Sequence, residues 1–376
     1  MTNGFKNVIL VIVFLSLIFA FGIFLFDEKD FSLSERRVLD KFPEVSKGTI
    51  SDGTLKELIF KKSDGKSKNF MDLFEAAGQD QFPMRDSLRA LKMFSSLHVF
   101  NNLTANKIYT YEGSIIEEVP KLNHEAISGN LDTIVSVYEN AIKGKAENVY
   151  FAYVPDKNYY FSSLSGRRLY DVDAFLALVS EKLPFAEQID ITDTLSKDSY
   201  YLTDSHWSQD KIIPTANKIA ETLGVTLPKE YTEKIISEKF SGVFASRYLL
   251  PTTPDKLVYL TNSTINAMSV KSLNDTTGML VTDYLYNPWK LTSEDMYDFF
   301  MSGANPVVYI TNPKAENDKE LVIFRDSFGS SLSPLLAQGY KKTTVIDLRY
   351  CWVSSVEKLA NFNNADVLFM YSSTLL

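Results

Sequence analysis

The chain has 376 residues, of which 45% are hydrophobic and 23% are charged, as in an ordinary globular protein. This length can bury one large core or two smaller ones. The formal net charge of −8, without a long basic run, argues against nucleic acid as the main ligand. Cys351 is the only cysteine, which excludes an intrachain disulfide and argues against a small secreted disulfide scaffold.

An uncharged run dominated by Val, Ile, Leu and Phe occupies residues 8–26. About 19 residues of helix, at roughly 1.5 Å each, approach the thickness of the hydrocarbon core of a bilayer. Lys6 precedes the run and acidic residues follow it, which favours a cytoplasmic N-terminus and an external body. A cleaved signal peptide is the alternative, but the run is longer than a usual signal core and no small-residue cleavage site follows it. We therefore expect residues 1–27 to be a cytoplasmic tip and a single-pass membrane anchor.

Residues 28–104 are expected to form a stalk and a helical lead-in. The first part has mixed charge, several glycines and no sustained periodicity. Between residues 69 and 97, apolar residues recur at helical spacing. Pro83 interrupts this pattern, so we predict two helices or one kinked helix.

In residues 105–376, predicted helices alternate with apolar strands. After a hairpin near 108–113, helices are predicted at 131–143, 173–183, 208–223, 293–301 and 353–361. Apolar strands are predicted at 148–154, 188–191, 306–310, 321–324, 343–348 and 367–371. Residues 230–290 show shorter alternating runs and Asn- and Gly-containing turns, which predicts a β-rich insertion. The alternation predicts an α/β fold with a parallel, doubly wound sheet covered on both faces.

The stretch LVIFRDSFGSS at 321–331 holds the best candidate nucleophile, Ser327. An apolar strand breaks at Arg325 and Asp326, and helix-starting residues follow. A serine between a strand end and a helix start is held on a sharp turn, beside free backbone N–H groups that can stabilise an oxyanion. The alternative is that Ser327 only caps the following helix.

The stretch YLTDSHWS at 201–208 supplies Asp204 and His206, two positions apart. A nucleophilic serine needs a base that takes its proton, and the base needs a carboxylate that fixes its tautomer. We predict His206 as the general base, Asp204 as its orienting carboxylate and Trp207 as a packing residue. If the two stretches form one site, the Ser327 hydroxyl should lie about 3 Å from one imidazole nitrogen, with the other facing Asp204.

Three further residues are candidates for substrate binding. Arg349 and Tyr371 are predicted to end neighbouring strands at the carboxyl edge of the sheet, and Lys157 follows the strand at 148–154. Each can equally be structural, as an ion pair or a cap of the core. Three scattered histidines and one cysteine offer no metal-ligand spacing, so neither a metal nor another cofactor is expected.

The order and spacing of these stretches resemble the DHHW family of bacterial surface proteins. That family is similar in turn to SGNH-hydrolase-like proteins that O-acetylate alginate and other exopolysaccharides. The resemblance covers almost the whole chain and rests on FSLSERRVLDKFPE at 31–44, DQFPMRD at 80–86, VPDK at 154–157, TDSHW at 203–207, RDSFGSSLSPLLAQGY at 325–340 and VIDLRY at 345–350. Ser205 stands where the family signature has its first histidine, whereas the Asp-x-His pair is kept. The GxND-type block, which adds an asparagine to the oxyanion hole of typical SGNH hydrolases, is absent.

The resemblance implies an SGNH-hydrolase-like domain at 105–376 and an extracytoplasmic Ser-His-Asp acyltransferase that O-acetylates a cell-surface or secreted polysaccharide. It also implies a multipass membrane acyltransferase as a partner that supplies acetyl groups. An esterase that removes acetyl groups would use the same three residues. An alternative of another class is a non-catalytic surface protein that binds glycan, in which Ser327 would point into the core.

Overall fold

The computed structural model describes residue 8 and residues 11–16, 29–42, 60–61, 67–68, 70–100, 102, 104–119, 121–274, 277–293 and 295–372. The chain divides into two compact units, Met1–Phe100 with Ser246–Leu250, and Asn101–Ala245 with Pro251–Leu376. The predicted anchor at 8–26 falls largely outside the described residues. Among the helices that are described, none is both long and apolar enough to span a bilayer. The domain limits expected from the sequence stay a prediction.

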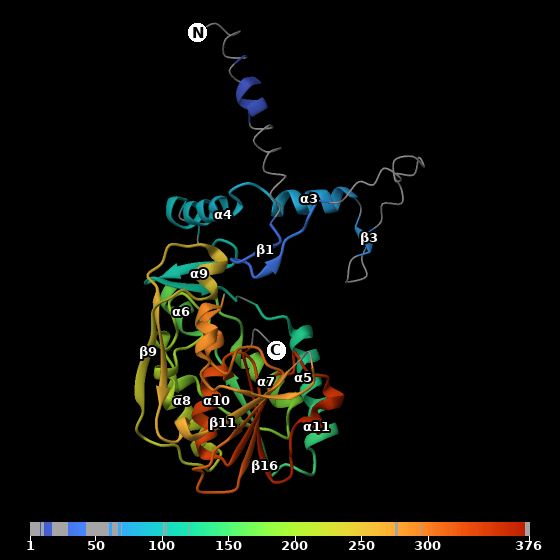
Figure 1. The fold of residues 1–376 in the computed structure, drawn as a ribbon, viewed down its shortest axis with the longest axis vertical. Helices are drawn as coiled ribbons and strands as arrows, with labels where there is room; N and C mark the ends of the chain where they lie inside the picture. Colours follow the sequence, from blue (N-terminus) through green and yellow to red (C-terminus); the bar gives the residue numbers. More distant parts are fainter. Residues whose placement is uncertain are drawn as a thin grey trace. The chain divides into compact units, whose positions relative to one another are not determined.

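Among the described residues of the smaller unit, helical residues 11–16 precede two short hairpins and the helices α3 and α4 (Figure 1). The antiparallel hairpins pair β1 (Phe31–Ser32) with β2 (Arg37–Val38) and β3 (Phe60–Lys61) with β4 (Ser67–Lys68). The helices are α3 (Phe70–Asp80) and α4 (Arg85–Phe94), and α4 continues into a π-helical turn at Ser95–Val99. Pro83 lies between α3 and α4, so the interruption predicted from the sequence is confirmed as a break between two helices.

The larger unit is built on an eight-stranded sheet with the order β12-β11-β13-β15-β14-β16-β7-β8. Its parallel part comprises β15 (Lys342–Ile346), β14 (Glu320–Arg325), β16 (Ala365–Ser372), β7 (Asn148–Val154) and β8 (Glu187–Ile189). At the other edge, the antiparallel strands are β13 (Val307–Thr311), β11 (Ser269–Leu273) and β12 (Leu280–Asp283). The prediction of a parallel sheet is therefore confirmed for the strands from β15 to β8. It is wrong for β13, β11 and β12, which are antiparallel.

Helices cover both faces of this sheet, as a doubly wound fold requires. One face packs against α8 (Ile213–Thr222) and α10 (Gly329–Leu336), and the other against α5 (His124–Val137), α7 (Val172–Lys182) and α11 (Val356–Leu359). Figure 1 shows α8 and α10 on one side and α5 and α11 on the other. All residues of β16 are buried, because both of its faces lie under helices.

The region 230–290 is β-rich as predicted, but it is not one insertion. β9 (Thr232–Phe240) and β10 (Asp255–Thr261) form an antiparallel hairpin of their own. β11 and β12 instead extend the main sheet, because β11 pairs with β13. The predicted hairpin near 108–113 is confirmed as β5 (Ile108–Tyr111) paired with β6 (Ser114–Glu117).

Two predicted helices differ in the structure. The helix predicted at 293–301 is wrong: a 3₁₀ turn at Pro288–Thr292 ends before this range, and the described residues within it form a 3₁₀ turn only at Met296–Phe299. The side chains of Asn287 and Asp295 accept hydrogen bonds from N–H groups two residues ahead, which competes with helix formation. The helix predicted at 353–361 is reduced to a 3₁₀ turn at Val353–Ser355 and the short α11. Two helices were not predicted, α6 (Lys157–Ser165) and α9 (Val243–Tyr248).

Candidate active site

Ser327 lies in the turn between β14 and α10, at the carboxyl edge of the parallel strands. The side chain of Asp326 fixes this turn: it accepts hydrogen bonds from the N–H of Phe328 (2.9 Å) and from that of Ser372 at the end of β16 (2.7 Å). Within the described part of the chain, the N–H of Ser327 itself donates no hydrogen bond. That N–H is therefore available to a ligand, as the predicted oxyanion donor must be.

The imidazole of His206 joins the two sequence stretches. Its Nε2 lies 2.7 Å from the hydroxyl oxygen of Ser327, a residue 121 positions away in the sequence. Its Nδ1 lies 2.6 Å from a carboxylate oxygen of Asp204. This is the geometry expected from the sequence, and it suits a neutral imidazole that donates to Asp204 and accepts from Ser327.

Asp204 is completely buried, yet its surroundings favour the charged carboxylate. Burial alone would raise the pKa of Asp204, but His206 and the N–H group of Val243 hold this pKa well below its usual range. The carboxylate accepts hydrogen bonds from the backbone N–H groups of His206 (3.0 Å) and Val243 (2.7 Å). A carboxylate with two backbone donors is fixed in orientation, so it can fix the imidazole in turn.

The loop that carries Asp204 is held by residues that the sequence analysis did not single out. Asp255, the first residue of β10, accepts hydrogen bonds from the N–H groups of Leu202 (2.7 Å) and Thr203 (2.8 Å). Gly242 packs so closely that a Cβ atom there would lie 2.3 Å from the Cβ of Asp204. No local sequence signal marks either residue, because the contact depends on the path of the β9–β10 hairpin.

Lys157 belongs to this loop support rather than to a substrate site. Its side chain is buried, and its ammonium nitrogen lies 2.6–3.2 Å from the carbonyl oxygens of Ile115, Tyr201, Leu202 and Asp204. Burial lowers the pKa of Lys157 to about 7, although the negative charges of Asp255 and Asp204 oppose this shift. The predicted substrate contact of Lys157 is therefore corrected: the residue positions the loop.

Tyr297 stacks on the imidazole of His206, with the ring centres 3.9 Å apart and the planes within 6°. The Tyr297 hydroxyl lies 2.9 Å from the hydroxyl of Ser331, which also accepts a hydrogen bond from the indole N–H of Trp207 (2.9 Å). Trp207 is fully buried, so its predicted packing role is confirmed. The stack and these hydrogen bonds restrict rotation of the His206 ring. The sequence does not predict a role for Tyr297, because its spacing indicates a helix at 293–301 instead of the 3₁₀ turn at Met296–Phe299.

Arg349 and Tyr371 lie on opposite sides of β14. The prediction that they end neighbouring strands is wrong, because β14 separates β15 from β16. Arg349 follows β15 and is half-exposed, with its guanidinium paired to both carboxylate oxygens of Asp347 (2.9 and 2.6 Å). Tyr371 is buried in β16, and its hydroxyl has no hydrogen-bond partner among the described residues. Substrate contact by Arg349 and Tyr371 stays a prediction.

No protein-family model matches this chain, and no curated protein matches its sequence. Solved structures do match. A DHHW family protein from Eubacterium siraeum superposes with a TM-score of 0.58 at 19% identity, over 72% of this chain and 92% of that protein. The chain shares the fold of a DHHW family protein.

PatB1 from Bacillus cereus, in a structure with a sulfonyl adduct, superposes with a TM-score of 0.55 at 21% identity, over 71% of this chain and 94% of PatB1. The resemblance found in the sequence is thus confirmed for the fold, and the mixed sheet fits the SGNH-hydrolase-like type.

The substitution Gly242→Ala tests the packing of Asp204. The added methyl group would displace the carboxylate, since it would also lie 2.8 Å from the backbone Cα of Asp204. We expect the downfield proton resonance of His206 Nδ1 to shift upfield or disappear, while the protein stays folded. The matched control is Gly129→Ala in α5, where an added Cβ meets nothing within 4 Å. An unchanged resonance in Gly242→Ala would contradict the proposed support of Asp204.

Proposed function

We propose that this protein is a serine-dependent acyltransferase that moves acetyl groups onto hydroxyls of a polysaccharide. The observation that carries the proposal is the alignment of Ser327, His206 and Asp204, with Nε2 2.7 Å from the serine and Nδ1 2.6 Å from the carboxylate. A serine in line with an imidazole and a carboxylate is the arrangement that activates a hydroxyl for acyl transfer. The resemblance to O-acetylating SGNH-like proteins supports acetyl as the group and a glycan as the acceptor.

In the first half of the proposed reaction, the oxygen of Ser327 attacks the carbonyl carbon of the acetyl donor. His206 Nε2 takes the serine proton, and Asp204 stabilises the imidazolium that forms. The N–H of Ser327 faces the negative charge that develops on the carbonyl oxygen. The bond to the donor then breaks, and the donor oxygen takes the proton from His206. The acetyl group is left as an ester on Ser327.

In the second half, an acceptor hydroxyl gives its proton to His206 and attacks the acetyl-serine carbonyl. The ester bond to Ser327 breaks, and the serine oxygen regains a proton from His206. A glycan hydroxyl as the acceptor makes the protein an acetyltransferase. Water as the acceptor makes it an esterase, which the same residues would serve.

The proposal includes a location and partners that rest on the sequence and the family resemblance. The apolar run at 8–26 is the proposed single-pass anchor, with the catalytic unit outside the cytoplasm. The glycan would then be a cell-surface or secreted polysaccharide. A multipass membrane acyltransferase is the proposed supplier of acetyl groups.

Substitutions of Ser327, His206 and Asp204 should lower the turnover of an aryl acetate, and their effects should not add, because the three residues act together. Ser327→Ala and His206→Ala should each abolish it, and the double variant should be barely worse than either single one. Asp204→Asn should lower turnover by about 10⁴-fold, because the imidazole would lose the partner that sets its tautomer. The control is His124→Ala, an exposed histidine at the start of α5, which should keep full turnover. Full turnover in Ser327→Ala would contradict the proposed nucleophile.

A competition between acceptors should distinguish transfer from hydrolysis. With an aryl acetate as donor and rising concentrations of candidate oligosaccharides, we expect acetylated oligosaccharide to increase as free acetate decreases. The measurement is mass spectrometry of the sugar beside an assay of acetate, with Ser327→Ala as the blank. Free acetate that does not depend on the sugar would favour the esterase. Glycan binding without any acetyl release would favour the non-catalytic alternative.

A further inference from the structure

In the smaller unit, the charged side of helix α4 faces the β1–β2 hairpin (the inner side), and its apolar side faces away from this hairpin (the outer side). On the inner side, Arg85 and Arg89 pair with Glu35, at 2.6 and 3.1 Å. The outer side carries Leu88 and Leu91, which are 46% and 62% exposed, and Met84, which directly precedes the helix, is 71% exposed. Leu88 and Leu91 are spaced i and i+3, so their side chains share one helix face. An apolar helix face normally lies against a core, and this one is open in the described structure.

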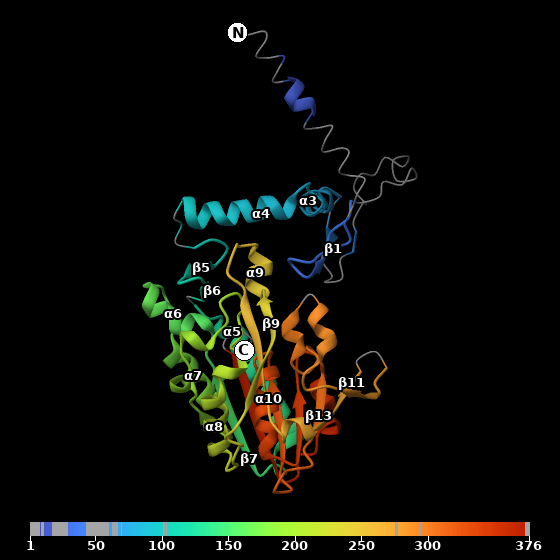
Figure 2. The ribbon, with the colours of Figure 1, turned by 60° about the vertical axis from the view of Figure 1, so that its left-hand side comes forward.

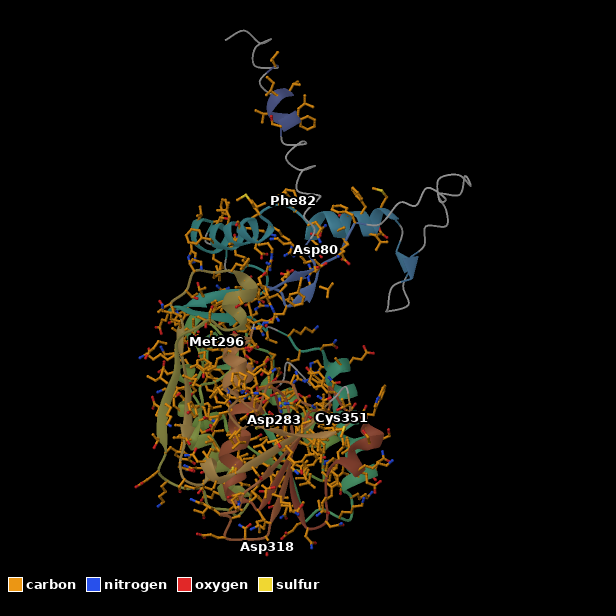
Figure 3. All side chains as sticks on the ribbon, viewed as in Figure 1. Asp80, Phe82, Asp283, Met296, Asp318 and Cys351 are labelled. Atoms are coloured by element: carbon orange, nitrogen blue, oxygen red, sulfur yellow. The ribbon has the colours of Figure 1, made fainter. Side chains whose placement is uncertain are left out.

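The inner side is already occupied by ion pairs with the β1–β2 hairpin. Asp80, the last residue of α3, is buried and accepts a hydrogen bond from the guanidinium of Arg37 in β2 (2.7 Å). Figures 1 and 2 show α3 and α4 forming one layer, with the β1–β2 hairpin on one side of it. Figure 3 shows Phe82 on the outer side of the α3–α4 corner and Asp80 on the inner side. Phe82 is 45% exposed, so the corner continues the apolar face of α4.

The chain that follows the apolar run is fixed at this same corner. The N–H of Lys29 donates to the side-chain oxygen of Gln81 (2.8 Å), and the Gln81 amide donates back to the carbonyl of Lys29 (3.0 Å). Only residues 27 and 28 separate Lys29 from the end of the run. At roughly 3.5 Å per residue, that distance is at most about 11 Å. A chain that leaves a bilayer at residue 26 therefore brings the α3–α4 corner to the lipid surface.

We propose that the face formed by Phe82, Met84, Leu88 and Leu91, the outer face of the α3–α4 corner, lies on the surface of the lipid bilayer. An amphipathic helix in this position buries its apolar side at the boundary of head groups and acyl chains. The two attachments, the anchor and the outer face, would fix the orientation of the smaller unit on the membrane. The inference rests on the proposed anchor at 8–26 and is independent of the proposed chemistry at Ser327.

The experiment places an environment-sensitive fluorophore on single cysteines in the full-length chain. The background is Cys351→Ser, and the test variants are Leu88→Cys and Leu91→Cys, labelled and reconstituted into phosphatidylcholine vesicles. The matched control is Leu33→Cys in the β1–β2 turn, since Leu33 is 67% exposed and thus as open as Leu91. We expect nitroxide-labelled lipid to quench the probes at 88 and 91, and aqueous iodide to quench the probe at 33.

Iodide quenching at 88 and 91 equal to that at 33 would overturn the proposal. So would protection of 88 and 91 from iodide without quenching by the lipid, because a protein would then cover the face. Flotation of the same samples tests the anchor separately: a chain that does not float with the vesicles overturns both the anchor and the docking. The same quenching in Ser327→Ala would support the docking, whatever the fate of the proposed activity.

Discussion

A buried carboxylate that stays charged, Asp204, is the constraint on which the candidate site depends. A buried charge is stable only when it is paired and hydrogen-bonded, since an uncompensated ion loses several kcal/mol of hydration free energy. Asp204 meets this condition through the His206 imidazole and two backbone N–H groups. Asp326, a buried carboxyl next to Ser327 in the chain, differs: burial raises its pKa although the N–H groups of Ser372 and Phe328 oppose this shift. The two carboxyl groups therefore have different roles: Asp204 orients the base His206, and Asp326 fixes the turn that carries Ser327.

Hydrogen bonds and ring stacking also hold the residues around Asp204 in position. Lys157 binds the carbonyl side of the loop, and Asp255 binds its N–H side. One face of the His206 ring stacks on the Tyr297 ring, and its Nε2 lies 2.7 Å from the Ser327 hydroxyl. The turn that carries Ser327 is tied through Asp326 to the end of β16. Preorganisation of this kind lets a site stabilise developing charge without rearranging.

The sequence could predict the three aligned residues because their signals are local. Ser327 follows an apolar strand, and Asp204 and His206 share one short stretch. Most parallel strands could be predicted for the same reason, as short apolar runs between helices. The order of the strands could not, because pairing partners are not encoded within a strand. Arg349 and Tyr371 were thus assigned to neighbouring strands although β14 lies between β15 and β16.

Burial and packing between distant segments account for the other errors. Lys157 follows a strand in the way a ligand-binding residue does, and only the fold shows that carbonyl groups enclose its ammonium. Tyr297 could not be found because its stacking on His206 depends on a 3₁₀ turn, Met296–Phe299, where a helix was predicted. The charged inner side and apolar outer side of α4 also become distinguishable only once the β1–β2 hairpin is in position.

The most direct test of the proposed chemistry is to trap the acyl group on the protein. The full-length protein is mixed briefly with an aryl acetate, quenched in acid, and digested for mass spectrometry of the peptide that contains Ser327. The account predicts an acetyl ester on Ser327 that forms with the first turnover and disappears when an acceptor sugar is added. Steady turnover with no acetyl group on Ser327, or with the acetyl group on another residue, would contradict it.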